Sequence, residues 1–284
     1  VSPSIQREPA NYTSLGYLRV AAATPSLVIG DAFANAKSIL EHANDLAAEG
    51  VALAVFPELC LTGYSAEDLF FSEALIADTQ SALHHLCACD MPLLIVGAPW
   101  RLGDGRLLNC AVAIGSYRVL GMIPKTFLPN YSEYYEQRWF ASGASVNETE
   151  VHDVLGTFHV RVDQLFRLGD ALVGAEICED LWAPVNPGTH AALAGANIVC
   201  NLSASNELRA RIRLPDQRLL EVKARLPNTL PEASKKNSST FNHSQDIASA
   251  VLEVSHRKTG LDATVAIDGD TIAAKRIFGI FELL

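Results

Sequence analysis

Short apolar runs separated by turn residues are the main pattern of the chain. A continuous apolar run of this length is typical of a strand that is buried on both faces, because such a strand shows no alternation. Two runs, 108–114 and 117–123, flank Gly115-Ser116 and predict a β-hairpin. Further strands are expected at residues 17–23, 51–56, 93–97, 158–162, 171–177 and 197–202.

Helical spacing of apolar residues separates several of these runs. The stripe between Asp31 and Gly50 predicts an amphipathic helix, with Asp31 as its N-cap and Gly50 just beyond its end. Residues 66–89 and 189–195 are also expected to be helical. Alternating strands and helices, with a hairpin between them, favour a layered α/β fold whose sheet is mixed rather than purely parallel.

The pattern changes after about residue 225. Residues 227–240 are polar and rich in Pro, Ser and Lys, which is typical of a flexible segment. Residues 211–226 and 245–254 are expected to form helices, and residues 262–267 a strand. We therefore expect one domain over residues 1–225. The atypical segment 226–284 follows it, and whether it completes the same domain is left open.

Composition narrows the class of protein. The chain has 284 residues, of which 49% are hydrophobic and 19% charged, so bulk disorder and coiled coil are excluded. Its net charge of −10 and pI near 5.2 argue against nucleic acid or an anionic membrane as the main partner. Six cysteines are too few for a disulfide scaffold, and the longest uncharged run is broken by prolines. We expect a cytoplasmic protein.

Three buried strands each run directly into a chemically useful residue. These residues are Glu58, Lys125 and Cys178, in that order along the chain. Ligands are held at the carboxyl ends of strands in α/β sheets, so the three side chains are expected to meet there. The cysteine would attack as a thiolate favoured by the ammonium group, and the glutamate would carry its proton. By contrast, His84, His85, Cys87 and Cys89 do not share one helix face, and no metal site is predicted.

Three motifs around these residues resemble the nitrilase superfamily of carbon-nitrogen hydrolases. They are FPELCLTGY at 56–64, IPKTFLPNY at 123–131 and AEICEDLW at 175–182. SAEDLF at 65–70, YSEYYEQRWF at 131–140 and NLSAS at 201–205 make the chain most similar to the glutaminase domain of glutamine-dependent NAD⁺ synthetases. The resemblance runs from about residue 11 to 225 and implies an α-β-β-α sandwich, with sandwiches that pair in oligomers.

The same resemblance implies roles for individual residues. Glu58 would be the general base, Lys125 the stabiliser of developing negative charge and Cys178 the nucleophile. The family carries a second acidic residue after the lysine, for which Glu133 is preferred and Glu136 is the alternative. The residues expected to bind substrate are Tyr64, Tyr131, Glu179, Trp182, Ser203 and Ser205, with Glu179 a candidate partner for the α-ammonium group of glutamine.

The implied activity is release of ammonia from the glutamine side chain through a thioester, for NAD⁺ biosynthesis. This reaction needs no cofactor. ATP and deamido-NAD would belong to a synthetase module, and no pyrophosphate-binding loop of that module is found in this sequence. The expected partners are glutamine or a similar small amide, further copies of the chain, and a synthetase module acting in trans. Two alternatives stay open: an amidase or carbamoylase acting on another small amide, and a non-catalytic member of the superfamily.

Overall fold

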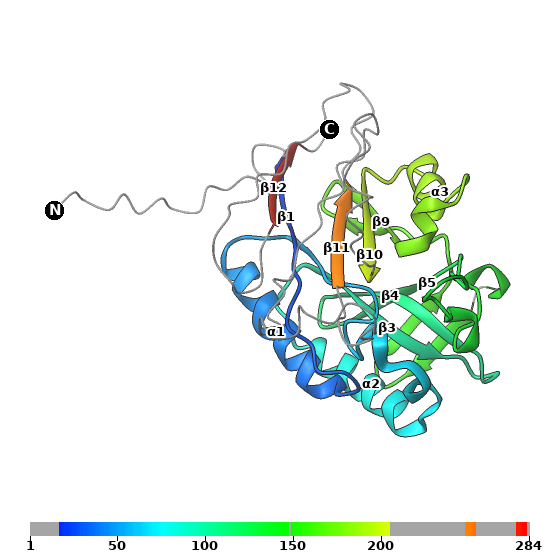
Figure 1. Ribbon diagram of the computed structural model, residues 1–284. Coiled ribbons are helices and arrows are strands. Elements are labelled where there is room, and N and C mark those ends of the chain that lie inside the picture. Colours follow the sequence, from blue (N-terminus) through cyan, green and yellow to red (C-terminus); the bar gives the residue numbers. More distant parts are fainter. Residues whose placement is uncertain (1–16, 148, 205–247, 254–276, 283–284) are drawn as a thin grey trace, which may run out of the picture.

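The chain folds into two β-sheets with helices on their outer faces. The computed structural model describes residues 17–147, 149–204, 248–253 and 277–282 (Figure 1). The strands of the larger sheet are Tyr17–Ala22 (β1), Leu53–Val55 (β2), Leu93–Arg101 (β3), Leu107–Gly115 (β4), Arg118–Pro124 (β5), Thr149–Asp153 (β6), Gly156–Val160 (β7) and Ile277–Glu282 (β12). Those of the smaller sheet are Phe166–Leu168 (β8), Ala171–Ile177 (β9), Ile198–Ala204 (β10) and Ala248–Glu253 (β11).

Both sheets mix parallel and antiparallel pairs, as the sequence predicted. The larger sheet has the order β12-β1-β2-β3-β4-β5-β7-β6, and the smaller has the order β11-β10-β9-β8. Strand β2 runs parallel to both β1 and β3, whereas β3, β4 and β5 are joined by antiparallel pairing. In the smaller sheet, β9 runs parallel to β10 and antiparallel to β8.

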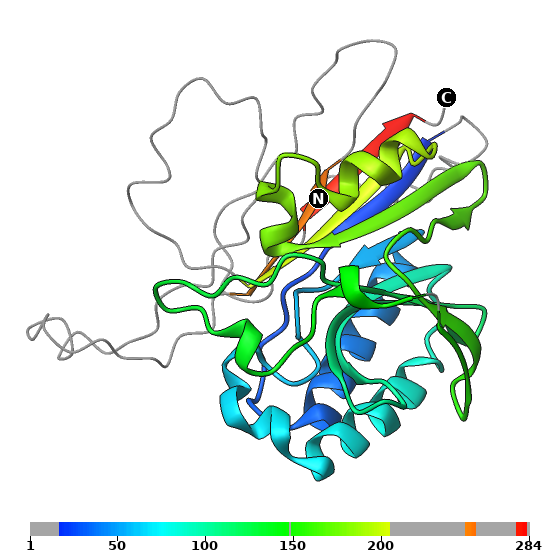
Figure 2. The same cartoon turned by 90° about the vertical axis from the view of Figure 1, so that its right-hand side faces the viewer.

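The helices complete four layers. Helices α1 (Ala32–Ala48) and α2 (Glu73–Leu86) pack on one face of the larger sheet through a buried apolar cluster. A second cluster fills the space between the two sheets. Helix α3 (Pro187–Leu193) covers the outer face of the smaller sheet, on the side opposite α1 and α2 (Figure 2). Side chains alternate accordingly: Ala21 of β1 joins the helix-side cluster, and Val20 joins the cluster between the sheets.

Several local predictions are confirmed. Helix α1 begins after Asp31, whose carboxylate accepts a hydrogen bond from the Ala34 N–H at 2.9 Å. Strand β9 has the predicted bounds. Strands β4 and β5 form the predicted hairpin, although the turn residues with positive φ are Ser116 and Tyr117, one position later than expected.

Other local predictions are wrong. The helix expected over 66–89 is interrupted: a 3₁₀ segment, η2 (Tyr64–Phe71), precedes α2, because Ser72 is extended and caps α2 through its side chain. The helix expected over 189–195 is present as α3, and only its bounds are wrong: it begins and ends two residues earlier, after its N-cap Asn186. Strands β6, β8 and β12 were not predicted. These three strands are short or lie in segments of weak pattern.

The segment after residue 225 contributes to both sheets. The helix expected over 245–254 is instead strand β11, which pairs antiparallel with β10 and uses the backbone groups along the edge of that strand. Strand β12 pairs with β1 at the edge of the larger sheet. The helix expected over 211–226 and the strand expected over 262–267 lie outside the described residues.

Candidate active site

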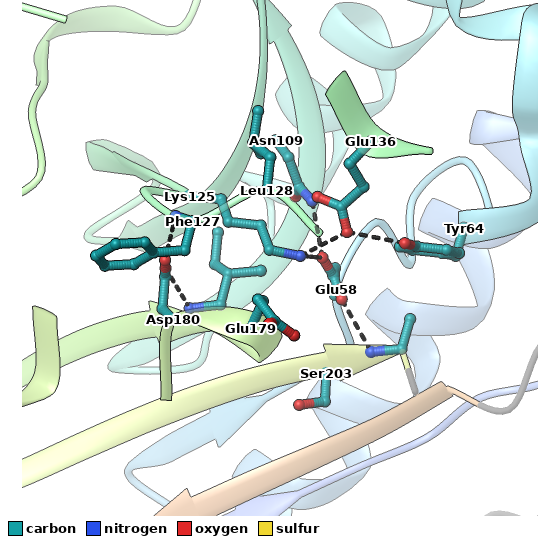
Figure 3. Close-up of polar contacts among 12 residues, drawn as sticks. Glu58, Tyr64, Asn109, Lys125, Phe127, Leu128, Glu136, Glu179, Asp180 and Ser203 are labelled. Atoms are coloured by element: carbon teal, nitrogen blue, oxygen red, sulfur yellow. Dashed lines mark hydrogen bonds and ion pairs between the residues drawn. The ribbon is translucent and has the colours of Figure 1, made fainter. Parts of the chain in front are cut away.

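The ends of β2, β5 and β9 come together between the two sheets, as the strand pattern predicted. Glu58 follows β2, Lys125 directly follows β5, and Cys178 directly follows β9. The side chains of Glu58 and Lys125 are completely buried. Figure 3 shows them converging with Glu136, Tyr64 and Asn109 on one small region.

Lys125 lies between two carboxylates. Its Nζ donates to Oε1 of Glu58 at 2.6 Å and to Oε1 of Glu136 at 2.6 Å. Glu58 Oε1 also accepts a hydrogen bond from Asn109 Nδ2 at 2.8 Å, and Glu58 Oε2 accepts one from the Ala204 N–H at 3.0 Å. Burial acts to lower the pKa of Lys125, but the nearby negative charges outweigh it and the pKa is raised. The lysine is therefore a fixed positive charge inside the protein.

The second acidic residue of the site is Glu136, which corrects our preference for Glu133. Glu136 is buried in a short 3₁₀ segment, η3 (Glu136–Arg138), and its Oε1 accepts hydrogen bonds from Lys125 and from the Tyr64 hydroxyl, the latter at 2.8 Å. Glu133 is exposed. The sequence alone offered both because only three residues separate them. The turn between them places the later one inward.

Burial governs the protonation of this second acid. Desolvation, together with the negative charge of Glu58, raises the pKa of Glu136 to about 7, against the opposing effects of Lys125 and Tyr64. The other oxygen, Glu136 Oε2, is buried and has no hydrogen-bond partner among the described residues. Glu136 can therefore hold or release a proton near neutral pH.

Cys178 sits at a strained turn. Its φ is 47°, in the left-handed region that non-glycine residues rarely adopt, and it begins the 3₁₀ segment η5 (Cys178–Trp182). It is also the only partly exposed cysteine of the six; the other five are buried. A strained backbone at a partly exposed cysteine that follows a buried strand is a feature of a nucleophile held for attack.

The thiol of Cys178 is protonated at neutral pH, because the lowering of its pKa that we expected from the lysine is outweighed. Burial and the charge of Glu58 raise its pKa to about 12, although Lys125 and the Ala204 N–H act in the opposite direction. The positive charge of Lys125 is already shared between two carboxylates. The thiol therefore needs a base at the moment of attack, and Glu58 shares the Ala204 N–H with it.

Asp180 connects the lysine and cysteine segments, a role that the sequence did not reveal. Its Oδ1 accepts hydrogen bonds from the N–H groups of Thr126 and Phe127 at 3.0 and 2.7 Å, and its Oδ2 accepts one from the Ile177 N–H at 3.0 Å. Burial raises the pKa of Asp180 to about 7, against these backbone donors. The only sequence signal is an acidic residue two positions after a candidate nucleophile.

Two glycines allow the catalytic segments to pack closely. A Cβ on Gly97 would lie 2.3 Å from Leu59 N and 2.4 Å from Pro57 O, so only glycine lets the segment carrying Glu58 cross β3. A Cβ on Gly143 would lie 2.6 Å from Pro124 O. The Gly143 N–H donates to the Lys125 carbonyl at 2.7 Å, which fixes the backbone of the lysine.

The residues predicted to bind substrate have different locations. Glu179 and Tyr131 meet at the surface beside Cys178, where the Tyr131 hydroxyl donates to the Glu179 carboxylate at 3.0 Å. Ser203 is buried near the end of β10 and donates to Asn201 Oδ1 at 2.6 Å. Trp182 is exposed, and Ser205 lies outside the described residues. Tyr64, predicted as a pocket residue, contacts Glu136 as described above.

Neither a metal site nor a membrane span is present in the described part of the chain. No group of three or more His, Cys, Asp and Glu residues there is placed to hold a metal ion. No helix in the same residues has the length and apolar character required to cross a bilayer.

A family model for carbon-nitrogen hydrolases matches residues 19–226. The chain belongs to the carbon-nitrogen hydrolase family. The match includes Glu58, Lys125, Glu136 and Cys178, and it covers the segments whose motifs carried the resemblance. The nitrilase-type fold expected from those motifs is confirmed.

Individual relatives narrow the comparison within the carbon-nitrogen hydrolases. The glutamine-dependent NAD(+) synthetase of Mycobacterium leprae is 40% identical over 226 residues, which are 76% of this chain and 32% of that protein. The structure of a glutamine-dependent NAD(+) synthetase from Cytophaga hutchinsonii matches with a TM-score of 0.61 at 29% identity, over 69% of this chain and 32% of that one. The chain spans about one third of the length of these synthetases.

A smaller enzyme shares the fold over most of its length. The structure of an amidase from Nesterenkonia sp. matches with a TM-score of 0.52 at 18% identity, over 69% of this chain and 68% of that one. At that identity the likeness concerns the fold alone. The chain therefore shares its fold with this amidase. In sequence it is more similar to the synthetases named above.

Proposed function

We propose that the chain is a glutamine amidohydrolase that releases ammonia from the side chain of glutamine. The observation that carries this proposal is the buried group of Glu58, Lys125 and Glu136 beside the strained, partly exposed Cys178. The names of the relatives support glutamine as the substrate, because they are glutamine-dependent enzymes.

The first half of the reaction forms a thioester. Glu58 accepts the thiol proton while Cys178 Sγ attacks the side-chain carbonyl carbon of glutamine. The negative charge that develops on the carbonyl oxygen is stabilised by Lys125 and by the backbone N–H of Glu179, because N–H groups in the first turn of a helix have no intrahelical acceptor. Glu58 then gives its proton to the amine as the carbon–nitrogen bond breaks, and ammonia leaves.

The second half consumes water. Glu58 takes a proton from a water molecule, whose oxygen attacks the thioester carbon. The carbon–sulfur bond breaks, glutamate leaves, and the proton returns to the thiolate of Cys178. No cofactor enters either half. The ammonia would be used by an ATP-dependent synthetase module of the kind that the longer relatives imply.

Glu179 is the residue that would bind the positive charge of the substrate. Free glutamine carries an α-ammonium group, and the partly exposed Glu179 directly follows Cys178, with the Tyr131 hydroxyl donating to its carboxylate. Unlike Glu58 and Glu136, Glu179 has no cation among the hydrogen-bond partners described for it, so it can accept the ammonium of a ligand.

Kinetics with two substrates test this proposal. The Glu179→Gln variant and the unchanged protein are compared on glutamine and on butyramide, which has a similar amide but no charged groups. We expect kcat/KM for glutamine to fall about 10- to 100-fold and that for butyramide to change less than about twofold. Equal losses on both substrates would argue for an amidase acting on simple amides, and no turnover of either would argue for a non-catalytic protein.

A further inference from the structure

Asn109 is a polar residue within a strand whose other residues are apolar or small. Every residue of β4 is buried, and Asn109 itself is 1% exposed. Its side-chain Nδ2 donates to Glu58 Oε1 at 2.8 Å, and its backbone oxygen accepts from the Lys125 N–H at 2.8 Å. This one residue therefore contacts both the candidate base and the backbone of the candidate lysine (Figure 3).

The two carboxylate oxygens of Glu58 have different hydrogen-bond partners. Oε1 accepts from Lys125 and from Asn109, which uses both of its lone pairs. Among the described residues, Oε2 accepts a hydrogen bond only from the Ala204 N–H, and that same N–H lies against the thiol of Cys178. Oε2 therefore keeps a lone pair on the side of the thiol.

The side-chain oxygen of Asn109 indicates that this residue does not serve stability. Its Oδ1 is buried without a hydrogen-bond partner among the described residues, and an unpaired buried acceptor costs free energy. A leucine has nearly the same shape and would carry no such cost. The value of an asparagine here lies in the donor that it aims at Glu58.

We propose that Asn109 is a positioning residue that saturates Oε1 of Glu58 and so directs Oε2 to the thiol proton. The inference rests on the proposed function in one respect, namely that Glu58 is the base for Cys178. The other charged or titratable groups around Glu58 are Lys125 after β5, Glu136 in η3 with its partner Tyr64, and Cys178 after β9.

Two variants of Asn109 test the proposal. Asn109→Leu removes the donor and keeps the shape, and Asn109→Asp replaces the donor with an acid. The rate of Cys178 alkylation by iodoacetamide and kcat/KM for glutamine are measured from pH 5 to 9, together with thermal unfolding. Asn35→Leu is the matched control, because Asn35 is equally buried but its side chain, among the residues that the structure describes, bonds only to the backbone of Val28 and Leu61.

We expect Asn109→Leu to unfold within a few degrees of the unchanged protein and to lower kcat about 10- to 100-fold with little change in KM. The rate of Cys178 alkylation should fall in parallel across the pH range, because Oε2 of Glu58 is no longer directed to the thiol proton. Asn109→Asp should lose more activity than Asn109→Leu, since it places a second acid against Oε1. Asn35→Leu should leave the alkylation rate unchanged.

The proposal is overturned if Asn109→Leu leaves the rate of Cys178 alkylation unchanged, or if its loss of activity only follows a loss of folded protein. The alkylation rate separates this result from a failure of the proposed function. If the unchanged protein does not hydrolyse glutamine but alkylation of Cys178 is still slower in Asn109→Leu, the positioning role stands and the substrate assignment falls.

Discussion

Two groups of ion pairs hold the segments around Cys178, and they differ in their access to water. Lys125 lies between Glu58 and Glu136, and none of the three side chains is more than 1% exposed. Arg138 and Asp68, two residues that join η3 to η2, form a pair that is 56% and 62% exposed. Both groups include carboxylates within 2.8 Å of a cation.

The difference shows what burial adds to an ion pair. In the exposed pair, hydrogen bonds from Arg138 and Trp139 lower the pKa of Asp68, so this carboxylate stays charged and only holds η2 against η3. In the buried group, desolvation raises the pKa of Glu136 to about 7, so a proton can move there near neutral pH. The exposed pair fixes positions, whereas the buried group can carry out proton transfer.

The largest effect is expected from Lys125→Met. This change leaves two carboxylates buried without their cation, and breaking a buried pair in this way costs about 3–5 kcal/mol of stability. Activity should be lost entirely. The matched control is the triple variant with Glu58→Gln and Glu136→Gln added, which should regain most of the stability in urea unfolding and stay inactive. A stable Lys125→Met protein would contradict the buried cluster.

The next largest effect is expected from Glu136→Gln, which is compared with the same change at Glu133, three residues earlier. Glu136→Gln should lower kcat about 100-fold or more, because it removes a carboxylate that contacts Lys125 and can exchange a proton near neutral pH. Glu133→Gln should stay within about twofold of the unchanged protein. Steady-state ammonia release measures both variants, and a reversed order would restore Glu133 as the second acid.

Stability should depend on pH through the buried acid. The pKa of Glu136 is raised from 4.5 to about 7 on folding, so its contribution is complete below pH 4.5 and is lost as pH rises through about 7. Asp180, with its pKa raised to about 7, acts in the same direction. Unfolding free energy measured at pH 5, 6 and 7 should therefore fall, and the fall should be smaller in Glu136→Gln. Equal slopes for the two proteins would show that Glu136 does not titrate in this range.

The smallest effect is expected from Asp68→Asn at the surface. The exposed pair is screened by water, so its loss should change the free energy of unfolding only slightly. Activity should fall less than about threefold, because η3 is also held by the buried contacts of Glu136. High salt should weaken the unchanged protein toward the variant. A larger loss than that of Glu136→Gln would reverse the comparison between the two groups.

The sequence predicted those features that depend on local pattern. Buried strands leave continuous apolar runs, so β9 and the residue that follows it, Cys178, could be placed from the order of residues alone. The choice between Glu133 and Glu136 could not be made in this way, because it depends on the path of a turn. The same holds for Asn109 and Asp180, whose roles depend on hydrogen bonds between segments far apart in the chain.

Tertiary pairing explains the largest error of the sequence reasoning. Residues 248–253 have a pattern compatible with a helix, but the edge of β10 offers unpaired backbone groups, and the segment pairs there as β11. The direction of the shift in the pKa of Cys178 was mispredicted for a related reason. Its pKa depends on burial and on how Lys125 divides its charge, and neither is visible in the order of residues. The cytoplasmic location and the oligomer stay predictions.

Labelling of Cys178 by a glutamine analogue tests the central claim most directly. A diazoketone analogue of glutamine places a reactive carbon where the side-chain amide would lie, and peptide mass spectrometry locates the adduct. We predict one adduct per chain, on Cys178, which glutamine suppresses, which forms far more slowly in Glu58→Gln and which is absent in Cys178→Ala. An adduct on one of the five buried cysteines, or none on the folded protein, would contradict the account.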